Sequence, residues 1–335
     1  MTTPVKIISR LPKDTLTIQW NPSNVCNFKC KYCYPNYNTG THRYPYERSE
    51  LVTDNLIYLM DYYKEYLGKK HFNIFMAGGE PTLVKDLEKI IEKIKKSHDI
   101  YFSIASNASR TVRWWNQYGH LIDNAHLTHH VDQGNVEHIT EVSDILYPKN
   151  VKTTVKVLMD PLHWDKAISD IQYMLDNSKF SWFIQVAKVV EQENYNTNYT
   201  EEQMAYLEKD LKRIPDLKWF WKNKHLLKSH MFLWESKAIL SNGKTIYARP
   251  GTYINKGWNN FQGWQCSIGS KRLCIQWNGN IMGSCGAKLF HSNSYYNILD
   301  EDFKNKFKPN LTPIICPFSS CTCSPETHED KEKID

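Results

Sequence analysis

Three cysteines near the N-terminus have the residue type and spacing to hold a metal centre. Cys26, Cys30 and Cys33 form a CxxxCxxC pattern directly after a strand-like run at residues 16–20. Thiolates on one loop can converge on one centre, and a [4Fe–4S] cluster held by three cysteines keeps one iron open for a cofactor. A zinc knuckle or a set of disulfide partners would use the same residues. The spacing therefore favours a metal site and leaves zinc and a disulfide as alternatives.

A second group of residues follows the strand-like run at 72–76. Gly78 and Gly79 would let the backbone approach a ligand closely, and Glu80 could pair with an ammonium group. A tight turn would use the same residues without any ligand. A ligand site is favoured because this motif directly follows a predicted strand, as the cysteine loop also does.

The cysteine loop resembles CxxxCxΦC, the signature of the radical S-adenosylmethionine (radical SAM) superfamily, in which Tyr32 stands at the aromatic position. The glycine–glutamate stretch resembles that family's motif for the amino group of S-adenosylmethionine, and the two motifs together are more specific than either alone. The resemblance implies a [4Fe–4S] cluster on the three cysteines, whose open iron chelates the amino and carboxylate groups of S-adenosylmethionine. It also implies that the glycine–glutamate motif and the tyrosine contact that cofactor. One-electron reduction would then give a 5′-deoxyadenosyl radical, which abstracts a hydrogen atom.

Polar residues end the third and fourth predicted strands. The family often presents polar side chains there to the ribose or carboxylate of the cofactor, which assigns Ser106 and Asn107 to cofactor binding by resemblance. The fourth strand ends in His129 and His130, and a histidine there could bind substrate or relay a proton. Adjacent strand residues point to opposite faces, so only one of the pair can face a barrel, and we take His130 as the candidate. A histidine satisfied at a strand end is the alternative.

Strands and helices that alternate along the chain must position these residues. The predicted strands are 16–20, 72–76, 101–105, 125–129, 151–158 and 181–187, and the helices follow at about 48–67, 85–97, 111–122, 135–147, 163–176 and 201–214. Apolar residues recur at helical spacing in several of the helices. Six such pairs predict an α/β fold with a parallel sheet or barrel. They match the partial (β/α)6 TIM-like barrel that the resemblance to the radical SAM family implies, and the post-strand loops of such a barrel would meet at one mouth.

A second set of cysteines lies between residues 266 and 323, around the hairpin signal Asn278-Gly279. A cysteine before a hairpin, another at its far end and a distal group resemble the SPASM or twitch extension of radical SAM enzymes, which holds auxiliary [4Fe–4S] clusters. Two features depart from that pattern. Five residues separate Gly279 from Cys285 where four are usual, and the distal cysteines form CxxxxCxC rather than CxxC.

The number of thiolates limits what this region can bind. Two further clusters would need eight thiolates, so the six present predict one auxiliary [4Fe–4S] cluster, and a structural zinc site is the alternative. The expected ligands are Cys266, Cys285, Cys316 and either Cys321 or Cys323. Cys274 is then spare. It could donate a hydrogen atom to a substrate radical, as in the family's epimerases, or be a buried strand cysteine.

Composition sets the broad class of the protein. The 335 residues, 41% of them hydrophobic, can bury a large core, and no run is long and apolar enough for a membrane helix or a signal peptide. We expect a cytoplasmic protein with reduced thiols. A net charge of +6 with Lys and Glu scattered evenly does not favour nucleic-acid binding. The expected organisation is an N-terminal segment (1–14), the barrel (15–215), an aromatic-rich linking region (216–264) and a small cysteine-rich, hairpin-containing auxiliary-cluster domain (265–335).

These features predict a radical SAM oxidoreductase that takes electrons from a flavodoxin or ferredoxin. The SPASM-like region favours a peptide substrate and crosslinking, oxidation or epimerisation, although about 15 residues before the first strand are too few for a leader-binding domain. A nucleotide sugar, a nucleoside or a nucleic acid is the alternative substrate. A zinc- or cluster-bearing binding module is the alternative without enzymatic activity.

Overall fold

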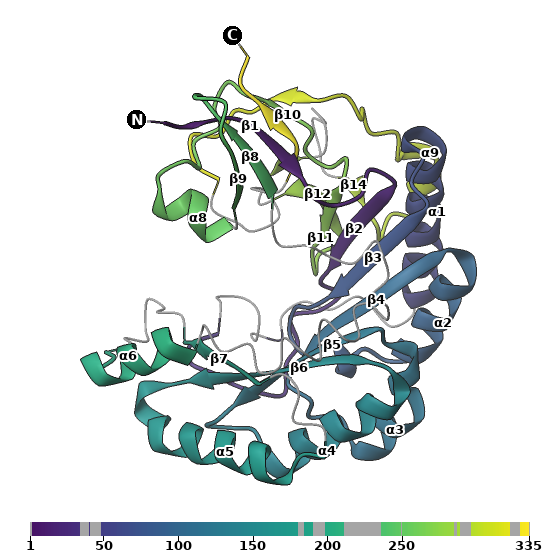
Figure 1. Ribbon diagram of the computed structural model, residues 1–335. Helices are drawn as coiled ribbons and strands as arrows, with labels where there is room; N and C mark the ends of the chain where they lie inside the picture. The colour runs from purple at the N-terminus through teal and green to yellow at the C-terminus, as the bar shows by residue number, and fades with distance from the viewer. Residues whose placement is uncertain are drawn as a thin grey trace.

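The computed structural model describes residues 2–33, 40, 48–179, 184–189, 198–210, 236–248, 250–284, 287–288, 296–321 and 329–334. Over these residues the chain forms a large curved sheet with helices along its outer side and a smaller second sheet beside one end (Figure 1). None of the described helices combines the length and the apolarity that a bilayer span needs.

The curved sheet confirms the predicted partial barrel. Its parallel strands run in chain order as β2 (Thr15–Trp20), β3 (His71–Met76), β4 (Asp99–Ser106), β5 (Asn124–His130), β6 (Lys152–Met159) and β7 (Ile184–Lys188). The helices that follow them are α1 (Ser49–Leu67), α2 (Leu87–Ser97), α3 (Val112–Tyr118), α4 (Val136–Leu146), α5 (Trp164–Asn177) and α6 (Glu201–Asp210). The start of the predicted sixth strand, 181–183, and the end of the sixth helix, 211–214, lie outside the described residues.

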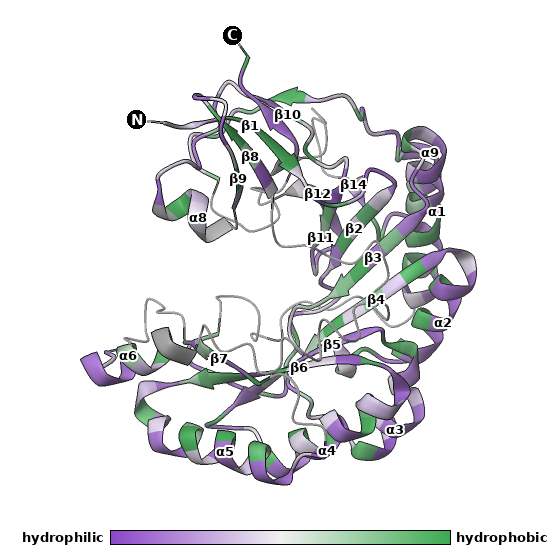
Figure 2. Ribbon diagram, in the orientation of Figure 1, coloured by the Kyte–Doolittle hydropathy of each residue, from purple (hydrophilic) through white to green (hydrophobic). Residues whose placement is uncertain are grey.

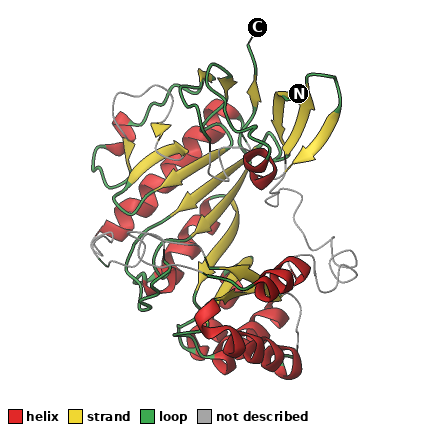
Figure 3. Ribbon diagram, turned by 90° about the vertical axis from the view of Figure 1, so that its left-hand side faces the viewer, coloured by secondary structure: helices red, strands yellow, loops and turns green. Residues whose placement is uncertain are grey.

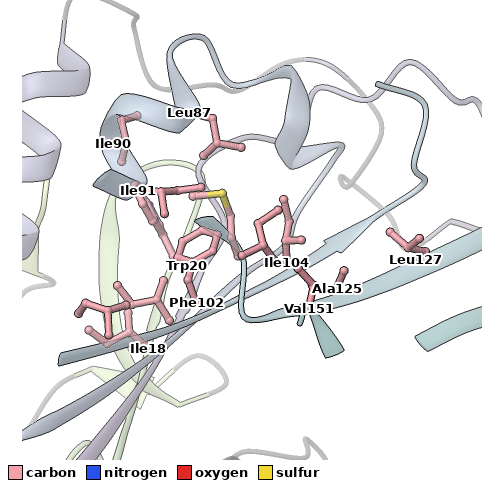
Figure 4. Packing of buried hydrophobic residues seen from close by; sticks show 14 of the residues in the cluster. Ile18, Trp20, Leu87, Ile90, Ile91, Phe102, Ile104, Ala125, Leu127 and Val151 are labelled. Atoms are coloured by element: carbon pink, nitrogen blue, oxygen red, sulfur yellow. The ribbon is translucent and has the colours of Figure 1, made fainter. Parts of the chain in front are cut away.

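The main core lies between the strands and the helices. Along α2 the residues Leu87, Ile90, Ile91 and Ile94 recur at helical spacing and are buried. In Figure 4 Leu87 and Ile91 point toward Trp20 of β2, which is 1% exposed. Each such apolar side chain contributes roughly 1.5–3 kcal/mol by its burial. Figure 2 shows hydrophobic and hydrophilic residues on both α4 and α5, as expected for helices with one face on a sheet.

The predicted hairpin is present, and it extends the barrel sheet. Strands β11 (Arg272–Ile275) and β12 (Asn280–Ser284) pair antiparallel, and Gly279 in their turn has a φ of 84°, a left-handed conformation that favours glycine. Strand β11 also pairs in parallel with β2. Two short strands, β13 (Ala287–Lys288) and β14 (Tyr296–Asn297), pair with β12, and α9 (Phe303–Lys306) packs near α1. The sequence placed this hairpin in a separate C-terminal domain, and the structure makes it part of the barrel sheet.

The second sheet joins the two ends of the chain. Its order is β15 (Ile314–Ile315), β10 (Gln265–Cys266), β16 (Lys331–Glu332), β1 (Pro4–Ser9), β8 (Ser236–Leu240) and β9 (Thr245–Ala248), and α8 (Pro250–Asn255) follows β9. Both termini therefore lie at the same end of the molecule (Figure 3). The residues predicted as a separate segment, 1–14, contribute β1 to this sheet, so the expected boundaries do not separate the two sheets.

Candidate functional site

The loops that follow β2, β3, β4 and β5 meet at the carboxyl ends of these strands. Parallel strands bring their carboxyl ends to one edge, which is where chemistry sits in barrels. The cysteine loop, residues 21–33, lies between the loop after β3 on one side and the ends of β4 and β5 on the other, as the contacts below show. The structure thus brings together the residues that the sequence selected in its N-terminal half.

Backbone hydrogen bonds join the cysteine loop to the glycine–glutamate loop. The N–H groups of Gly79 and Glu80 donate to the carbonyl oxygens of Ser23 and Val25, each at 2.8 Å. A methyl group on Gly79 would overlap the Val25 carbonyl, and one on Gly78, whose φ is 118°, would overlap that of Ser23. The two glycines are therefore needed because two protein backbones approach closely here, a reason that the sequence did not indicate.

Glu80 is buried, and its carboxylate is bound by protein donors. Its Oε1 accepts hydrogen bonds from the N–H and hydroxyl of Thr82 at 3.0 and 2.6 Å and from the hydroxyl of Ser106 at 2.8 Å. Its Oε2 accepts from the N–H of Asn107 at 2.7 Å. Burial raises the pKa of Glu80, and the hydrogen bonds oppose that rise. The side chain fastens the loop after β3 to the end of β4.

Ser106 and Asn107 occupy different positions relative to the cysteines. The hydroxyl of Ser106 is engaged, because it donates to Glu80 and accepts from the N–H of Ala108 at 3.0 Å. The side-chain amide of Asn107 donates to Asn27 Oδ1 at 3.0 Å and lies 3.8 Å from Cys26 Sγ. Asn107 is thus the residue of this pair that reaches the cysteine loop.

The segment after β5 holds the other side of the cysteine loop. His130 Nδ1 lies 3.2 Å from Cys30 Sγ, and the Gln133 side-chain amide donates to the same sulfur at 3.4 Å. The side-chain carbonyl oxygen of Gln133, Oε1, accepts a hydrogen bond from the N–H of Lys29 at 2.6 Å. A single amide therefore binds both a backbone group and a cysteine sulfur of this loop.

Tyr32 completes this contact between the two loops. Its hydroxyl donates to Asp132 at 2.8 Å and lies 3.2 Å from His130 Nδ1, and the Tyr32 and His130 rings stack at 5.9 Å between centroids. Burial lowers the pKa of His130 to about 4, although the Asp132 charge opposes this, so the imidazole is neutral near pH 7. Tyr32 therefore helps to position the loop through its hydroxyl as well as its ring.

The two adjacent histidines face opposite sides of β5, as expected. His129 is 1% exposed and points toward the helices, where its Nε2 lies 2.7 Å from Asp170 of α5. His130 points toward the cysteine loop. The histidine pair thus divides between a structural contact with α5 and a position beside the cysteine loop, and the functional role of His130 stays a prediction.

Cys26, Cys30 and Cys33 offer three thiols from one loop. Burial, followed by the charge of Asp132, raises the pKa of Cys30 to about 12, and burial also raises that of Cys26. Such thiols release their protons when a metal cation compensates the charge. In the described part of the chain no three His, Cys, Asp or Glu side chains stand close enough to hold one metal ion. A [4Fe–4S] cubane attaches each thiolate to a different iron, so three thiols from one loop are a donor set that fits such a cluster.

Three of the C-terminal cysteines belong to the hydrophobic cluster beside the second sheet. Cys266, Cys316 and Cys321 are buried in one hydrophobic cluster. Burial raises the pKa of Cys266 to about 11, and the nearby charge of Lys331 opposes this rise. Cys285 and Cys323 lie outside the described residues, so the predicted auxiliary ligand set stays a prediction.

Cys274 lies away from these three, on β11. It pairs in register with Gln19 of β2 and is half-buried. Side-chain amides of Gln276 and Asn21 lie 3.3 and 3.9 Å from its sulfur. Cys274 is thus part of the barrel sheet and lies outside the cluster that contains the other three cysteines.

Sequence reasoning missed several residues of the site, including Gln133, Asp132 and Asn27. Gln133 and Asp132 follow closely after the last residue of β5, and loops after parallel strands share one edge. That rule could have selected them. Their partners in the cysteine loop could not be known, because those contacts join residues about 100 positions apart.

The part of the chain that contains this site is similar to known proteins. The family model described as "Radical SAM superfamily" matches residues 20–160, which run from the end of β2 to the end of β6. A GTP 3',8-cyclase of Haemophilus ducreyi is 26% identical over 117 residues, which are 34% of this chain and 33% of that protein. A GTP 3',8-cyclase of Psychromonas ingrahamii is 43% identical over 72 residues, 22% of this chain and 19% of that protein. The chain thus matches a third or less of the length of these relatives.

A solved structure of a histidine-tagged anSMEcpe with bound AdoMet has a similar fold. Its TM-score is 0.50, its sequence identity is 16%, and the similarity covers 89% of this chain and 81% of that one. At this identity the likeness supports the fold alone.

Proposed function

We propose that this chain, which carries a radical SAM domain at residues 20–160, cleaves S-adenosylmethionine reductively and removes a hydrogen atom from its substrate. The observation that carries the proposal is the meeting of the three-cysteine loop with the glycine–glutamate loop and the ends of β4 and β5. Every contact that joins these loops lies inside the matched domain.

The residues of the site would have distinct roles. Cys26, Cys30 and Cys33 would hold a [4Fe–4S] cluster, and the glycine–glutamate loop, Tyr32 and Asn107 would line the S-adenosylmethionine site beside it. When bound, these two groups supply a 5′-deoxyadenosyl radical that abstracts hydrogen. The protein side chains position the loops, and Gln133 donates a hydrogen bond to one ligand sulfur.

Reduction of that cluster would need an external electron donor of the flavodoxin or ferredoxin type. We further propose one auxiliary [4Fe–4S] cluster at the C-terminal cysteines. Its support is the burial of Cys266, Cys316 and Cys321 in one cluster of side chains. Such a cluster would accept an electron from a product radical or bind the substrate.

Two substrate classes have support from different observations. The grouped C-terminal cysteines resemble the extension that is common in peptide-modifying enzymes, which favours a peptide. The two curated relatives described above are GTP 3',8-cyclases by name, which favours a nucleotide.

Anaerobic reconstitution with iron and sulfide tests the proposed chemistry. With dithionite and S-adenosylmethionine the wild-type chain should release 5′-deoxyadenosine, and Cys30→Ala should lose both the N-terminal cluster signal and the product. Cys274→Ala is the matched control, because it removes a thiol outside the triad and should retain this cleavage. A reconstituted wild-type chain that binds the cluster and yields no 5′-deoxyadenosine would rule the proposal out.

A further inference from the structure

The barrel strands have one face toward the helices and one toward the concave side. On β6 Val155, Val157 and Met159 belong to the core under the helices, so the residues between them lie on the opposite face. Leu158 on that face packs with Cys30 and Tyr32, which identifies it as the side of the candidate site. In Figure 1 helices α1 to α5 follow the outer side of the sheet, and the inner face is concave.

Two lysines and a histidine lie on this inner face. Lys152 and Lys156 share it because they are four residues apart on β6, and His126 of β5 stands level with Thr154 between them. The charges of both lysines act on the His126 imidazole, and burial with these charges lowers its pKa to about 4. The three groups therefore form one cationic surface with a neutral imidazole at its centre.

No acidic side chain in the described part of the chain compensates the two lysines. Burial is the sole cause of the lowered pKa of Lys152 and of Lys156, and no carboxylate contributes to either shift. Asp99 is the carboxylate found at the inner positions of β2 to β7, and it lies at the strand start, 2.6 Å from His71 Nδ1. Half-burying two ammonium groups without a counter-charge costs free energy that a bound anion would return.

Two uncharged polar atoms on the same face are buried and lack a hydrogen-bond partner. Thr17 Oγ1 of β2 and Asn124 Oδ1 of β5 are buried without a hydrogen-bond partner. Asn124 pairs in register with Lys152, so one of these atoms lies within the cationic surface. Buried polar atoms normally form hydrogen bonds to protein, water or a ligand. These two atoms therefore indicate that water or a polar ligand occupies this face.

We propose that Lys152 and Lys156 bind an oligophosphate group of the substrate, such as that of a nucleoside di- or triphosphate, on the inner face of the barrel. The proposal rests on the proposed radical SAM function, because it places the substrate beside that site. Residues four apart on a strand have Cα atoms about 13 Å apart. An elongated polyanion can contact both flexible lysine side chains over that distance. A single carboxylate has one negative charge and can neutralise only one of the two ammonium groups. This inference favours a nucleotide over a peptide.

Binding of sodium tripolyphosphate to the full-length chain tests the proposal. Calorimetry should show that Lys152→Gln and Lys156→Gln each weaken its affinity by about tenfold, as expected for loss of one charge-assisted contact. Lys96→Gln is the matched control, because it removes the same charge from an exposed position on α2. Lys156→Arg, which keeps the charge, should bind more tightly than Lys156→Gln. Acetate at equal concentration should not compete.

The outcomes separate this inference from the proposed function. Equal affinity of wild type, Lys152→Gln and Lys156→Gln for tripolyphosphate would overturn the phosphate site, and so would equal competition by acetate. Dithionite-driven 5′-deoxyadenosine formation without substrate is measured on the same proteins and should be unchanged in both lysine variants. Tripolyphosphate binding that depends on the lysines in a chain without such cleavage would refute the proposed function and keep the anion site.

Discussion

Replacing Glu80 by glutamine tests whether its carboxylate is a structural anchor. The carboxylate accepts four hydrogen bonds, from the N–H and hydroxyl of Thr82, the hydroxyl of Ser106 and the N–H of Asn107. Glutamine keeps the shape and has one acceptor oxygen. Whichever way the amide turns, its NH2 group faces a donor that has lost its acceptor.

The expected cost follows from these contacts. A hydrogen bond to a charged group contributes about 1.5–3 kcal/mol, and leaving a buried donor unsatisfied costs about 1–3 kcal/mol. The hydroxyl of Ser106 can rotate to accept a hydrogen bond, which recovers part of the loss, and neutralising a fully buried group recovers more. We therefore expect Glu80→Gln to lower the free energy of unfolding by about 2 kcal/mol and Glu80→Ala, which removes the acceptor altogether, by about 4 kcal/mol.

Urea unfolding followed by circular dichroism measures this loss. Glu65→Gln, on the exposed side of α1, is the control and should change the free energy of unfolding by less than about 0.5 kcal/mol. A Glu80→Gln variant with wild-type stability and weakened S-adenosylmethionine binding would refute the anchor role and assign the carboxylate to the ammonium group of the cofactor.

Three further predictions concern other residues. Gly79→Ala should prevent stable iron–sulfur reconstitution, because its methyl group meets the Val25 carbonyl, and an iron content equal to wild type would contradict this. Burial raises the pKa of Glu329 to about 7 from its ordinary 4.5, so the unfolded chain ionises first and stability should fall by about 3 kcal/mol from pH 4.5 to 7. Glu329→Gln, followed by thermal unfolding across that range, should remove the fall. Gln133→Leu should lower the potential of the reconstituted N-terminal cluster by about 40 mV, because a hydrogen bond to Cys30 Sγ favours the reduced state. Redox titration monitored by electron paramagnetic resonance measures that shift, and an unchanged potential would count against it.

The local elements of this protein could be read from its sequence. Apolar spacing in 87–94 and β-branched runs such as 151–158 identify α2 and β6, because helix and strand periodicity are properties of neighbouring residues. The spacing of Cys26, Cys30 and Cys33 identified the candidate site for the same reason. The rule that post-strand loops of parallel strands meet at one edge then placed Glu80, Asn107 and His130 beside the cysteines.

Contacts between distant segments were decided by the tertiary structure. Pairing of β11 with β2, the grouping of Cys266 with Cys316 and Cys321, and the hydrogen bond from Gln133 to Cys30 join residues that no local pattern connects. The inner-face position of Lys152 and Lys156 also depends on which side of β6 the helices cover. Such contacts depend on how whole elements pack, since the free energy of burial is shared among residues far apart in the chain. The sequence by itself determined the candidate cysteine and glycine–glutamate motifs, because their spacing is local, and the packing of the sheet determined what surrounds them.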